Sequence, residues 1–409
     1  MKERLKTLVL DADGGGLWRY VALDTALRGI LRSRMDVSVL PAPLRDSYWA
    51  RELVGPRYGI LSYALDWREA LCTASQLDVE TCNVNNLIEY RRQRESIRQY
   101  PLIVILHAAA GDRMRLLQAT AHWFAGRKGR LVVFLGNEYD RMDEKLAFLR
   151  SVGAEYVCSQ LPIESARWVY AECRPTRVLS MPHALNPGVY GSNPSVPRTI
   201  DIGFCGDVYP PFIGDTERTA IITRFQAQGR ELGLEVDFRL NARMQRADWA
   251  DFLRRCRGTV GAESGSYYLD RQGRMLREAK AYGRRHPRAS FEEVFERFFR
   301  APRLPFVSGK SISSRHFEPI GTKTCQLLLE GHYNGILQPG EHYIPIKKDL
   351  SDLRDAVQRF RDEDERRRIV ERAYEYVMDQ HTYGHRVQAL IRAVGEDAGV
   401  PAAESPFRS

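Results

Sequence analysis

The sequence lacks several features that would assign it to a common protein class. Its 409 residues contain no apolar run of about 18 residues, so we expect no membrane-spanning helix. Seven cysteines are scattered without a C-x-x-C pair, which favours reduced thiols over a zinc site. The opening residues, MKERLKTLVLDADGGG, place only a short apolar run before a glycine turn, so they predict a first strand rather than a signal peptide.

Three catalytic motifs are also missing. No G-x-G-x-x-G follows a predicted strand, and the nearest glycine turn is at 14–16. The SGKS segment at 308–311 lacks the upstream glycine of a Walker A loop, and no G-x-S-x-G elbow occurs. These absences argue against a dinucleotide fingerprint, a P-loop and a serine hydrolase. The sequence therefore gives no sign of a bound cofactor, and the scattered cysteines argue against a zinc site.

The net charge of +9 is concentrated in one segment. Arg271–Arg303 contains ten Lys or Arg residues and four Glu, a local excess of six positive charges. Such a segment attracts phosphates, an anionic membrane surface or nucleic acid, although a solvated helical insertion has the same composition. No recognised nucleic-acid motif accompanies it, so nucleic acid is not expected as a partner.

The spacing of apolar residues predicts two successive α/β units. In the first half, strand-like runs alternate with helical stretches, which is the pattern of a parallel, doubly wound sheet. The predicted strands lie at 5–10, 35–40, 101–106, 131–135, 155–158 and 177–181. A segment rich in Pro, Gly and Asn then predicts a linker, and a second α/β series begins at Thr199.

The expected fold class is therefore α/β, with two Rossmann-like domains facing across a cleft and a helical C-terminal tail. The predicted divisions are an N-terminal domain at 1–182, a linker at 183–198, a C-terminal domain at 199–383 with a basic insertion at 270–305, and a C-terminal helix and tail at 384–409. Ligands of such sheets bind outside the carboxyl ends of the strands, so the cleft is the expected site.

One stretch, at 308–339, combines a polar, glycine-containing loop with an apolar run. The run predicts a short helix that ends at Gly331 and is followed by a strand. In such a helix Lys323, Gln326 and Glu330 share one face. A helix N-terminus, a lysine and two long polar side chains suit a bound phosphate and a pair of sugar hydroxyls. An ordinary surface helix is the alternative.

Three motifs of the second half occur together in a known family. GFxGD is matched by Gly203–Asp207, and PGxxY by Pro339–Tyr343. Between them the family has a Lys or Arg, a Glu three residues later and a Gly five residues after that; Lys323, Gln326 and Gly331 have this spacing. The second half thus resembles the nucleotide-sugar domain of GT-B glycosyltransferases, especially group-1-like families that include spore-maturation-type proteins.

The resemblance implies a metal-independent glycosyltransferase that moves a sugar from a nucleoside-diphosphate sugar to an acceptor. The acceptor would be a glycan, a lipid-linked molecule or a small molecule, bound by the N-terminal domain. The residues expected to bind the donor are Gly206, Asp207, Arg218, Tyr267, Arg315, Lys323, Thr324, Gln326 and His332. Those expected to bind the acceptor are Gly15, Gly16, Asn137 and Glu138. The catalytic candidates are His107, Glu318 and Glu263.

The chemistry gives these candidates their roles. Cations, with Lys323 first among them, would stabilise the diphosphate leaving group. His107 follows a predicted strand, where it would contact the sugar or act as a base toward the acceptor. Glu318 has the spacing of the family's E-x7-E motif relative to Gln326. Glu263, at the end of another predicted strand, is its rival, and the insertion between the two leaves the choice open.

Two other functions remain open. An epimerase or hydrolase acting on the nucleotide sugar would need carboxylates, such as Asp112 and Glu138. A non-catalytic nucleotide-sugar-binding protein would fit Gln326 in place of the family's Glu. If the protein is a glycosyltransferase, the basic insertion would lie near an anionic membrane that holds a lipid-linked acceptor. We expect a cytoplasmic protein, peripheral at the inner face of the membrane, in cell-surface polysaccharide biosynthesis.

Overall fold

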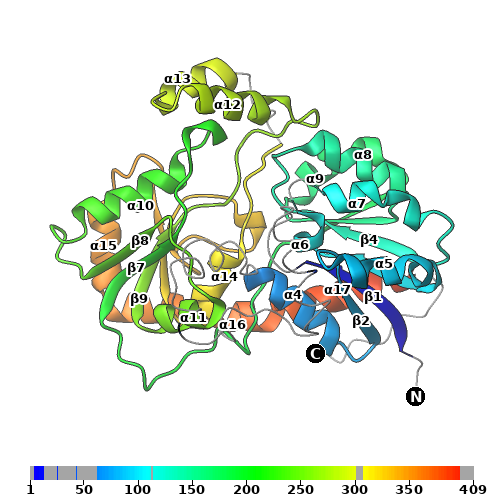
Figure 1. Cartoon of the computed structure of the whole chain (residues 1–409). Helices are drawn as coiled ribbons and strands as arrows, with labels where there is room; N and C mark the ends of the chain where they lie inside the picture. The colour runs from blue at the N-terminus through cyan, green and yellow to red at the C-terminus, as the bar shows by residue number, and fades with distance from the viewer. Residues whose placement is uncertain are drawn as a thin grey trace.

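The computed structural model describes residues 4–12, 62–111, 114–300 and 307–396, together with Thr25 and Pro43. Two parallel β-sheets, each packed with helices, lie side by side (Figure 1). This confirms the expected α/β class with two Rossmann-like units. Among the described helices, none combines the length and the apolar character needed to span a bilayer.

The N-terminal sheet has the strand order β2-β1-β3-β4-β5-β6, and every pairing is parallel. Its strands are β1 (Leu5–Asp11), β2 (Leu77–Asn83), β3 (Leu102–Ile105), β4 (Arg130–Phe134), β5 (Tyr156–Ser159) and β6 (Arg177–Ser180). Its helices are α4 (Ser62–Thr73), α5 (Leu87–Ser96), η3 (Ile97–Gln99), α6 (His107–Ala110), α7 (Arg115–Ala119), η4 (Ala121–Phe124), α8 (Met142–Val152), α9 (Ile163–Val169) and η5 (Ala171–Cys173).

Strand β2 has no counterpart among the predicted strands. Its sequence, LDVETCN, mixes acidic and apolar residues, because β2 is an edge strand that is only partly buried. The central strand β3 is instead a continuous buried apolar run, as the sequence predicts. The strand predicted at 35–40 lies outside the described residues.

The C-terminal sheet has the order β11-β10-β9-β7-β8 and is also parallel. Its strands are β7 (Ile200–Gly206), β8 (Val236–Leu240), β9 (Cys256–Gly261), β10 (Cys325–Leu329) and β11 (Ile344–Ile346). The helices of the second half are η6 (Pro211–Ile213), α10 (Glu217–Gln228), α11 (Arg246–Arg254), α12 (Arg274–Arg285), α13 (Phe291–Phe298), α14 (Ser314–Gly321), η7 (Tyr333–Gly335), α15 (Leu353–Arg361), α16 (Glu363–Gln380) and α17 (Tyr383–Glu396).

The structure corrects the prediction of one helix through Lys323, Gln326 and Glu330. Helix α14 ends at Gly321, and the apolar run after it is the fully buried strand β10. A short apolar run carries no periodicity that separates a buried strand from a buried helix. The three polar side chains therefore do not form one helix face. The prediction of a strand after Gly331 is also wrong, because the 3₁₀ helix η7 follows β10.

The predicted C-terminal helix is present as α17, and it packs against the N-terminal sheet. Its apolar residues Tyr383, Val387 and Leu390 belong to one cluster with Val9 of β1 and Trp67 of α4. The chain therefore crosses back to its first domain at its end (Figure 1). The sequence shows the amphipathic helix but not the sheet on which it packs.

An ion-pair network joins helix α4 of the N-terminal half to helix α11 of the C-terminal half. The guanidinium of Arg246 lies 2.9 Å from Asp66 and 2.6 Å from Glu69. The Asn186 amide donates to both carboxylates. Asp66 is buried and one of its oxygens has no hydrogen-bond partner, so burial raises its pKa to about 7 despite the arginine.

The basic insertion makes a second set of ion pairs between the two halves. Three of its cations pair with acids of the N-terminal half: Arg271 with Glu172 (3.2 Å), Arg277 with Asp143 (2.9 Å) and Lys280 with Asp140 (2.6 Å). Leu269 packs against the N-terminal core beside them. At Gly273, with φ at +61°, a Cβ atom would lie 2.8 Å from an Asp143 oxygen, so only glycine fits this close approach. Three positive charges of the insertion are thus paired with carboxylates of the same chain.

The Arg246 network predicts a measurable loss of stability on truncation. Arg246→Met leaves Asp66 buried without its cation, which should lower the free energy of unfolding by about 3 kcal/mol. Urea unfolding measures this change. Arg257→Met, which removes the more exposed pair of Arg257 with Asp201, is the matched control and should cost less than about 1 kcal/mol. Equal losses in the two variants would contradict the role given to the network.

Candidate functional site

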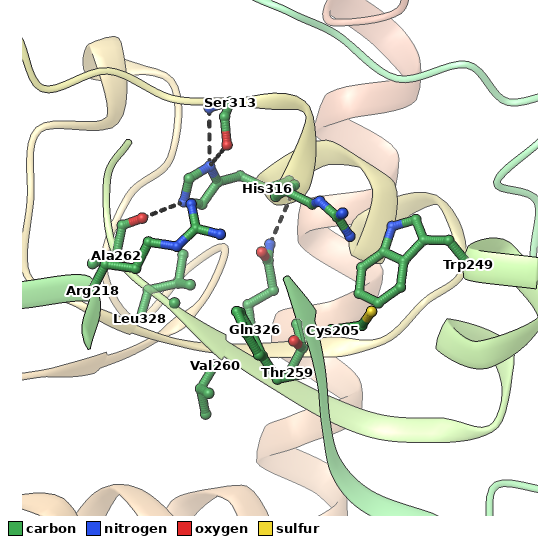
Figure 2. A pocket seen from close by; sticks show the side chains of 13 residues that line it. Cys205, Arg218, Trp249, Thr259, Val260, Ala262, Ser313, His316, Gln326 and Leu328 are labelled. Atoms are coloured by element: carbon green, nitrogen blue, oxygen red, sulfur yellow. Dashed lines mark hydrogen bonds between the residues drawn. The ribbon is translucent and has the colours of Figure 1, made fainter. Parts of the chain in front are cut away.

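A hollow opens on the C-terminal sheet, between β7, β9 and β10 and the first turns of α10 and α14 (Figure 2). We call it the C-terminal hollow. It comprises about 410 Å³ not filled by atoms, including the part open to solvent. Its polar and aromatic lining includes Arg218, Trp249, Thr259, Arg315, His316 and Gln326.

Arg218 is the second residue of α10 and lines the hollow. Its guanidinium carbon lies 5.9 Å from the Phe204 ring centre and 5.2 Å from that of Tyr209. Among the residues that the structure describes, no carboxylate forms an ion pair with it. The aromatic rings therefore orient a positive charge that is not neutralised.

Arg315 is the second residue of α14 and lines the same hollow. Its guanidinium carbon lies 4.3 Å from the Trp249 ring centre. Its Nε is 3.9 Å from the Glu318 carboxylate, and its buried Nη1 has no hydrogen-bond partner. Two arginines at the N-termini of two helices thus face one space, and this geometry attracts an anion.

His316 fixes the start of α14 beside the hollow. Its Nδ1 accepts the backbone N–H of Ser313 at 3.0 Å, and its Nε2 lies 3.1 Å from the carbonyl oxygen of Ala262. Because a carbonyl only accepts, Nε2 carries the proton. Burial, followed by the charge of Arg218, lowers the pKa of His316 to about 4. The ring is therefore neutral near pH 7.

Gln326 points into the hollow from β10, next to Thr259 of β9 in the strand register. Its Nε2 donates to the His316 carbonyl oxygen at 3.0 Å. Its Oε1 is buried without a hydrogen-bond partner. The sequence prediction places Gln326 at a ligand site on a helix face; the structure places it at a hollow on a strand instead.

Lys310, the lysine of the SGKS segment, is buried and holds this region together. Lys310 is 2% exposed and lies 2.8 Å from Asp215 and 3.1 Å from Glu217. Burial alone would lower the pKa of Lys310, but the two carboxylates raise it above its usual value. The network ties the loop before α14 to the start of α10, so it sets how far apart the two helix N-termini lie.

Glu318 connects the hollow to the N-terminal half. Its side chain is buried, and one oxygen accepts the indole N–H of Trp249 at 2.7 Å. The other oxygen accepts the hydroxyl of Ser62, the first residue of α4, at 3.0 Å. Glu318 does not line the hollow itself, but Trp249 and Arg315 do.

The family motif of a cation, a Glu and a Gly can be aligned with this sequence in a second way, in which Lys323 stands at the glycine position. Arg315, Glu318 and position 323 satisfy the same spacing as Lys323, Gln326 and Gly331. Lys323 has a φ of +54°, the left-handed conformation in which glycine is common. Arg315 and Glu318 also lie on a helix at the hollow, whereas Gln326 lies on a strand.

Several expected donor residues lie away from the hollow. Lys323 and Thr324 precede β10, at the amino end of the sheet; the lysine pairs with Glu371 at 2.6 Å, and the threonine donates to the Leu253 carbonyl. His332 is exposed after β10.

The remaining predicted residues of the C-terminal half have partners within the chain. Gly206 ends β7, and Asp207 pairs with Arg243 at 3.3 Å. The Tyr267 hydroxyl donates to Glu217 at 2.7 Å, and Glu263 accepts the backbone N–H of Tyr333 at 2.7 Å. The structure therefore brings Arg218, Arg315 and Gln326 together at the hollow and leaves the others outside its lining.

His107 lies where the sequence predicts it, just after β3 at the carboxyl end of the N-terminal sheet. It is buried among the rings of Tyr63, Trp67, Phe134 and His183, and neither ring nitrogen has a hydrogen-bond partner. Burial lowers its pKa to about 3, so the imidazole is neutral.

Glu138, expected to bind an acceptor, is buried and holds the loop after β5. It accepts from Ser159 at 2.6 Å, from Tyr170 at 2.5 Å and from the backbone N–H of Gln160 at 2.8 Å. Asn137 beside it is exposed, with a φ of +48°. The predicted residues Gly15, Gly16 and Asp112 lie outside the described residues.

Comparison with known proteins finds a family match for part of the second half. Residues 251–392 match the family described as glycosyl transferase-like. No curated protein is similar enough in sequence to match the chain. The match includes α14 and β10, and it confirms the prediction of a glycosyltransferase; the spore-maturation subgroup stays a prediction.

Solved structures share the two-sheet architecture. An α-glucosyltransferase crystallised with UDP and a 13-mer DNA containing a HMU base has a TM-score of 0.53 at 9% identity, covering 96% of this chain and 100% of that one. The α-glucosyltransferase complex with a mismatched DNA gives 0.52 at 8% identity, with 95% and 99% coverage. HepE from Anabaena, solved with UDP and glucose, gives 0.49 at 12% identity, with 96% and 100% coverage. At these identities the similarity concerns the fold.

The buried neutral histidines predict acid sensitivity. The pKa of His107 is about 3 in the folded chain and about 6.5 when unfolded, so the unfolded state binds more protons between these values. Stability should therefore fall as the pH drops below about 6.5, and His107→Phe should reduce that slope by about 1.4 kcal/mol per pH unit. Urea unfolding at pH 4.5 to 7 measures it. Exposed His122→Phe is the control; an unchanged slope in His107→Phe would refute the burial of a neutral ring.

Proposed function

We propose that this glycosyltransferase binds a nucleoside-diphosphate sugar in the C-terminal hollow and transfers the sugar to an acceptor held by the N-terminal half. The observation that carries the proposal is the pair Arg218 and Arg315. Each is the second residue of its helix, and none of the described residues that line the hollow is acidic. Two guanidinium groups and two helix N-termini suit a diphosphate.

Transfer breaks the bond between the anomeric carbon and a diphosphate oxygen, and the diphosphate leaves with the negative charge. In our proposal Arg218 and Arg315 stabilise that charge as it develops, because they are fixed in place before the reaction starts. These two cations take the place that a metal ion has in other transferases. Transfer would therefore persist in the presence of EDTA.

In this proposal Glu318 contacts the nucleoside-diphosphate sugar as well, since it follows Arg315 at the motif's spacing. A carboxylate accepts two hydroxyls of a ribose diol well. One Glu318 oxygen now accepts from Ser62 of α4 and the other from Trp249, so ribose binding would replace both contacts, one of which joins the two halves. Glu263 is instead assigned to holding η7 through the N–H of Tyr333.

The acceptor side is proposed at the carboxyl ends of the N-terminal strands, where His107 and Asn137 lie. A group with a pKa near 3 is a weak base at neutral pH, so His107 suits a hydrogen bond to the transferred sugar better than proton abstraction. The acceptor class proposed is a glycan or a lipid-linked molecule. The α-glucosyltransferase of similar fold was crystallised with DNA, but no nucleic-acid motif occurs in this sequence.

The alternatives have less support. A nucleotide-sugar epimerase or hydrolase that uses Glu138 would need that carboxylate free, but it already accepts three hydrogen bonds. A non-catalytic protein was suggested by Gln326 in the place of a Glu. If the motif is aligned with Arg315 and Glu318 instead, its Glu position is occupied by a Glu and no Gln replaces it.

The arginine pair is tested by ligand binding. The α-glucosyltransferase of similar fold was crystallised with UDP, so UDP and UDP sugars come first in a panel with ADP and GDP. Arg218→Met and Arg315→Met should each weaken nucleoside-diphosphate affinity about 10- to 100-fold, because each removes a charge-assisted contact. Isothermal titration gives the affinity, and release of the diphosphate from the sugar donor gives turnover.

Lys323→Met is the matched control, since Lys323 pairs with Glu371 away from the hollow. It should bind the nucleoside diphosphate as tightly as the unmodified chain. Loss of affinity in Lys323→Met with retention in both arginine variants would reverse the assignment. Binding by none of the nucleoside diphosphates would overturn the proposed function.

We also propose that the outer end of the basic insertion contacts an anionic membrane at the cytoplasmic face, where a lipid-linked acceptor for cell-surface polysaccharide is held. Arg284, Arg285 and Arg288 are exposed at the end of α12 and in the connection to α13. Within the described part of the chain they make no ion pair. They are therefore available to lipid phosphates after the three interdomain pairs are formed.

Flotation with vesicles that contain an anionic lipid tests this contact. Replacing Arg284, Arg285 and Arg288 by Gln should reduce vesicle binding at least tenfold, at about 1 kcal/mol per arginine. Replacing Arg91, Arg92 and Arg94, exposed on α5, removes the same charge elsewhere and should have less effect. Equal losses would mean attraction by net charge alone, and absence of binding in the unmodified chain would refute the contact.

A further inference from the structure

The side-chain amide of Asn334, in η7, joins the two halves of the molecule. Its Nδ2 donates to the backbone carbonyl of Gln160, in the N-terminal half, at 2.9 Å. Its Oδ1 accepts the backbone N–H of Ile312, in the C-terminal half, at 2.8 Å. A side-chain amide carries one acceptor oxygen and one donor nitrogen, so a single orientation of this side chain satisfies both bonds.

The backbone at this position does not explain the choice of asparagine. Asn334 has a φ of +55° and follows Tyr333 at +44°, so the chain makes a left-handed turn there. Glycine adopts such a conformation without strain and would serve the backbone as well. Glu263 holds the turn through the backbone N–H of Tyr333, without using the Asn334 side chain. We therefore attribute the asparagine to its two side-chain hydrogen bonds.

Both partners of this amide belong to segments next to the proposed site. Gln160 directly follows β5, at the edge of the N-terminal sheet where the acceptor side is proposed. Ile312 is buried and lies three residues before Arg315, which lines the hollow. At the other end of the same loop, the N–H of Ser308 donates to the Ser165 hydroxyl of α9 at 3.0 Å. The loop before α14 is thus docked on the N-terminal half at both of its ends.

Transfer requires the two halves to be held in one fixed relation, since the reacting atoms must lie about 3 to 3.5 Å apart. In the proposed function one half binds the sugar donor and the other binds the acceptor. We propose that Asn334 is a positioning residue for this transfer, which docks the arginine-bearing start of α14 on the N-terminal half. This rests on the proposed function, whereas the docking itself is a property of the chain without ligand.

Two variants separate the two hydrogen bonds. Asn334→Asp keeps an acceptor for the Ile312 N–H but places a carboxylate oxygen against the Gln160 carbonyl, where neither atom can donate. Asn334→Gly keeps the left-handed turn and removes both bonds. Hydrogen exchange of the chain without ligand measures the first bond: the Ile312 N–H should stay protected in Asn334→Asp and exchange about tenfold faster in Asn334→Gly. An unchanged rate in Asn334→Gly overturns the inference.

Affinity and turnover measure the second bond. The probe is whichever of UDP, ADP and GDP binds the unmodified chain most tightly by isothermal titration, with a nucleotide sugar of the same base for turnover. Asn334→Asp should keep the affinity within about twofold and lower the turnover number about tenfold, the worth of one hydrogen bond. Asn334→Gly should lower both, because the start of α14 then also loses its support. Equal effects of the two variants on affinity, or an unchanged turnover number in Asn334→Asp, overturn the inference.

Asn241→Asp is the matched control. Asn241 follows β8 at the same edge of the C-terminal sheet, has a φ of +53°, and accepts the backbone N–H of Val208 in the same half. It adds the same charge and should change neither affinity nor turnover; a loss of turnover like that of Asn334→Asp would assign the effect to charge and overturn the inference.

A further variant keeps the inference testable if the Asn334 variants do not fold. Ser165→Ala removes the docking bond at the other end of the loop and should also lower turnover while keeping the affinity. Absence of that difference counts against the inference. If no nucleoside diphosphate binds the unmodified chain, the proposed function fails; if one binds and only the difference between affinity and turnover is absent, the proposed function stands and this inference fails.

Discussion

Parallel pairing of the strands is the constraint on which the rest of this structure depends. A parallel strand cannot return through a tight turn, so each crossover places a loop and a helix N-terminus at the same edge of the sheet. In the C-terminal half, α10 and α14 begin there with an arginine as the second residue of each. The buried ion pairs of Lys310 with Asp215 and Glu217 then fix the spacing of these two helix starts. The hollow is positively charged because the parallel topology brings these two helix starts, each with its arginine, to the same edge of the sheet.

The same reasoning separates what could be predicted from what could not. Continuous apolar runs such as β3 identify buried parallel strands, and their alternation with helices predicts both sheets. The mixed sequence of β2 hides an edge strand, and the five residues of β10 resemble a helix as much as a strand. That second error put Lys323, Gln326 and Glu330 on one helix face that the structure does not contain. A spacing motif is only as reliable as the secondary structure assigned to it.

Long-range contacts account for the remaining differences. Arg218 lies near a helix start, which is a local property that a sequence can indicate. The opposite ends of the chain meet where α17 packs on β1, and nothing local in either segment indicates the contact. Lys310 looked like part of an incomplete phosphate loop, yet its charge is used by two carboxylates about 95 residues away in the chain. Burial and partners of this kind are set by the tertiary fold, which a single sequence does not show.

The two sets of ion pairs between the halves contain pairs that differ in their exposure to solvent. At the insertion, the Arg277 and Asp143 side chains are 47% and 36% exposed; at α4, Asp66 is 1% exposed. Dissolved ions screen exposed pairs and barely reach buried ones. Raising the ionic strength would therefore weaken the Arg277–Asp143 pair before the Arg246–Asp66 pair. The contact of the N-terminal half with the insertion would therefore depend more on salt than its contact with α11.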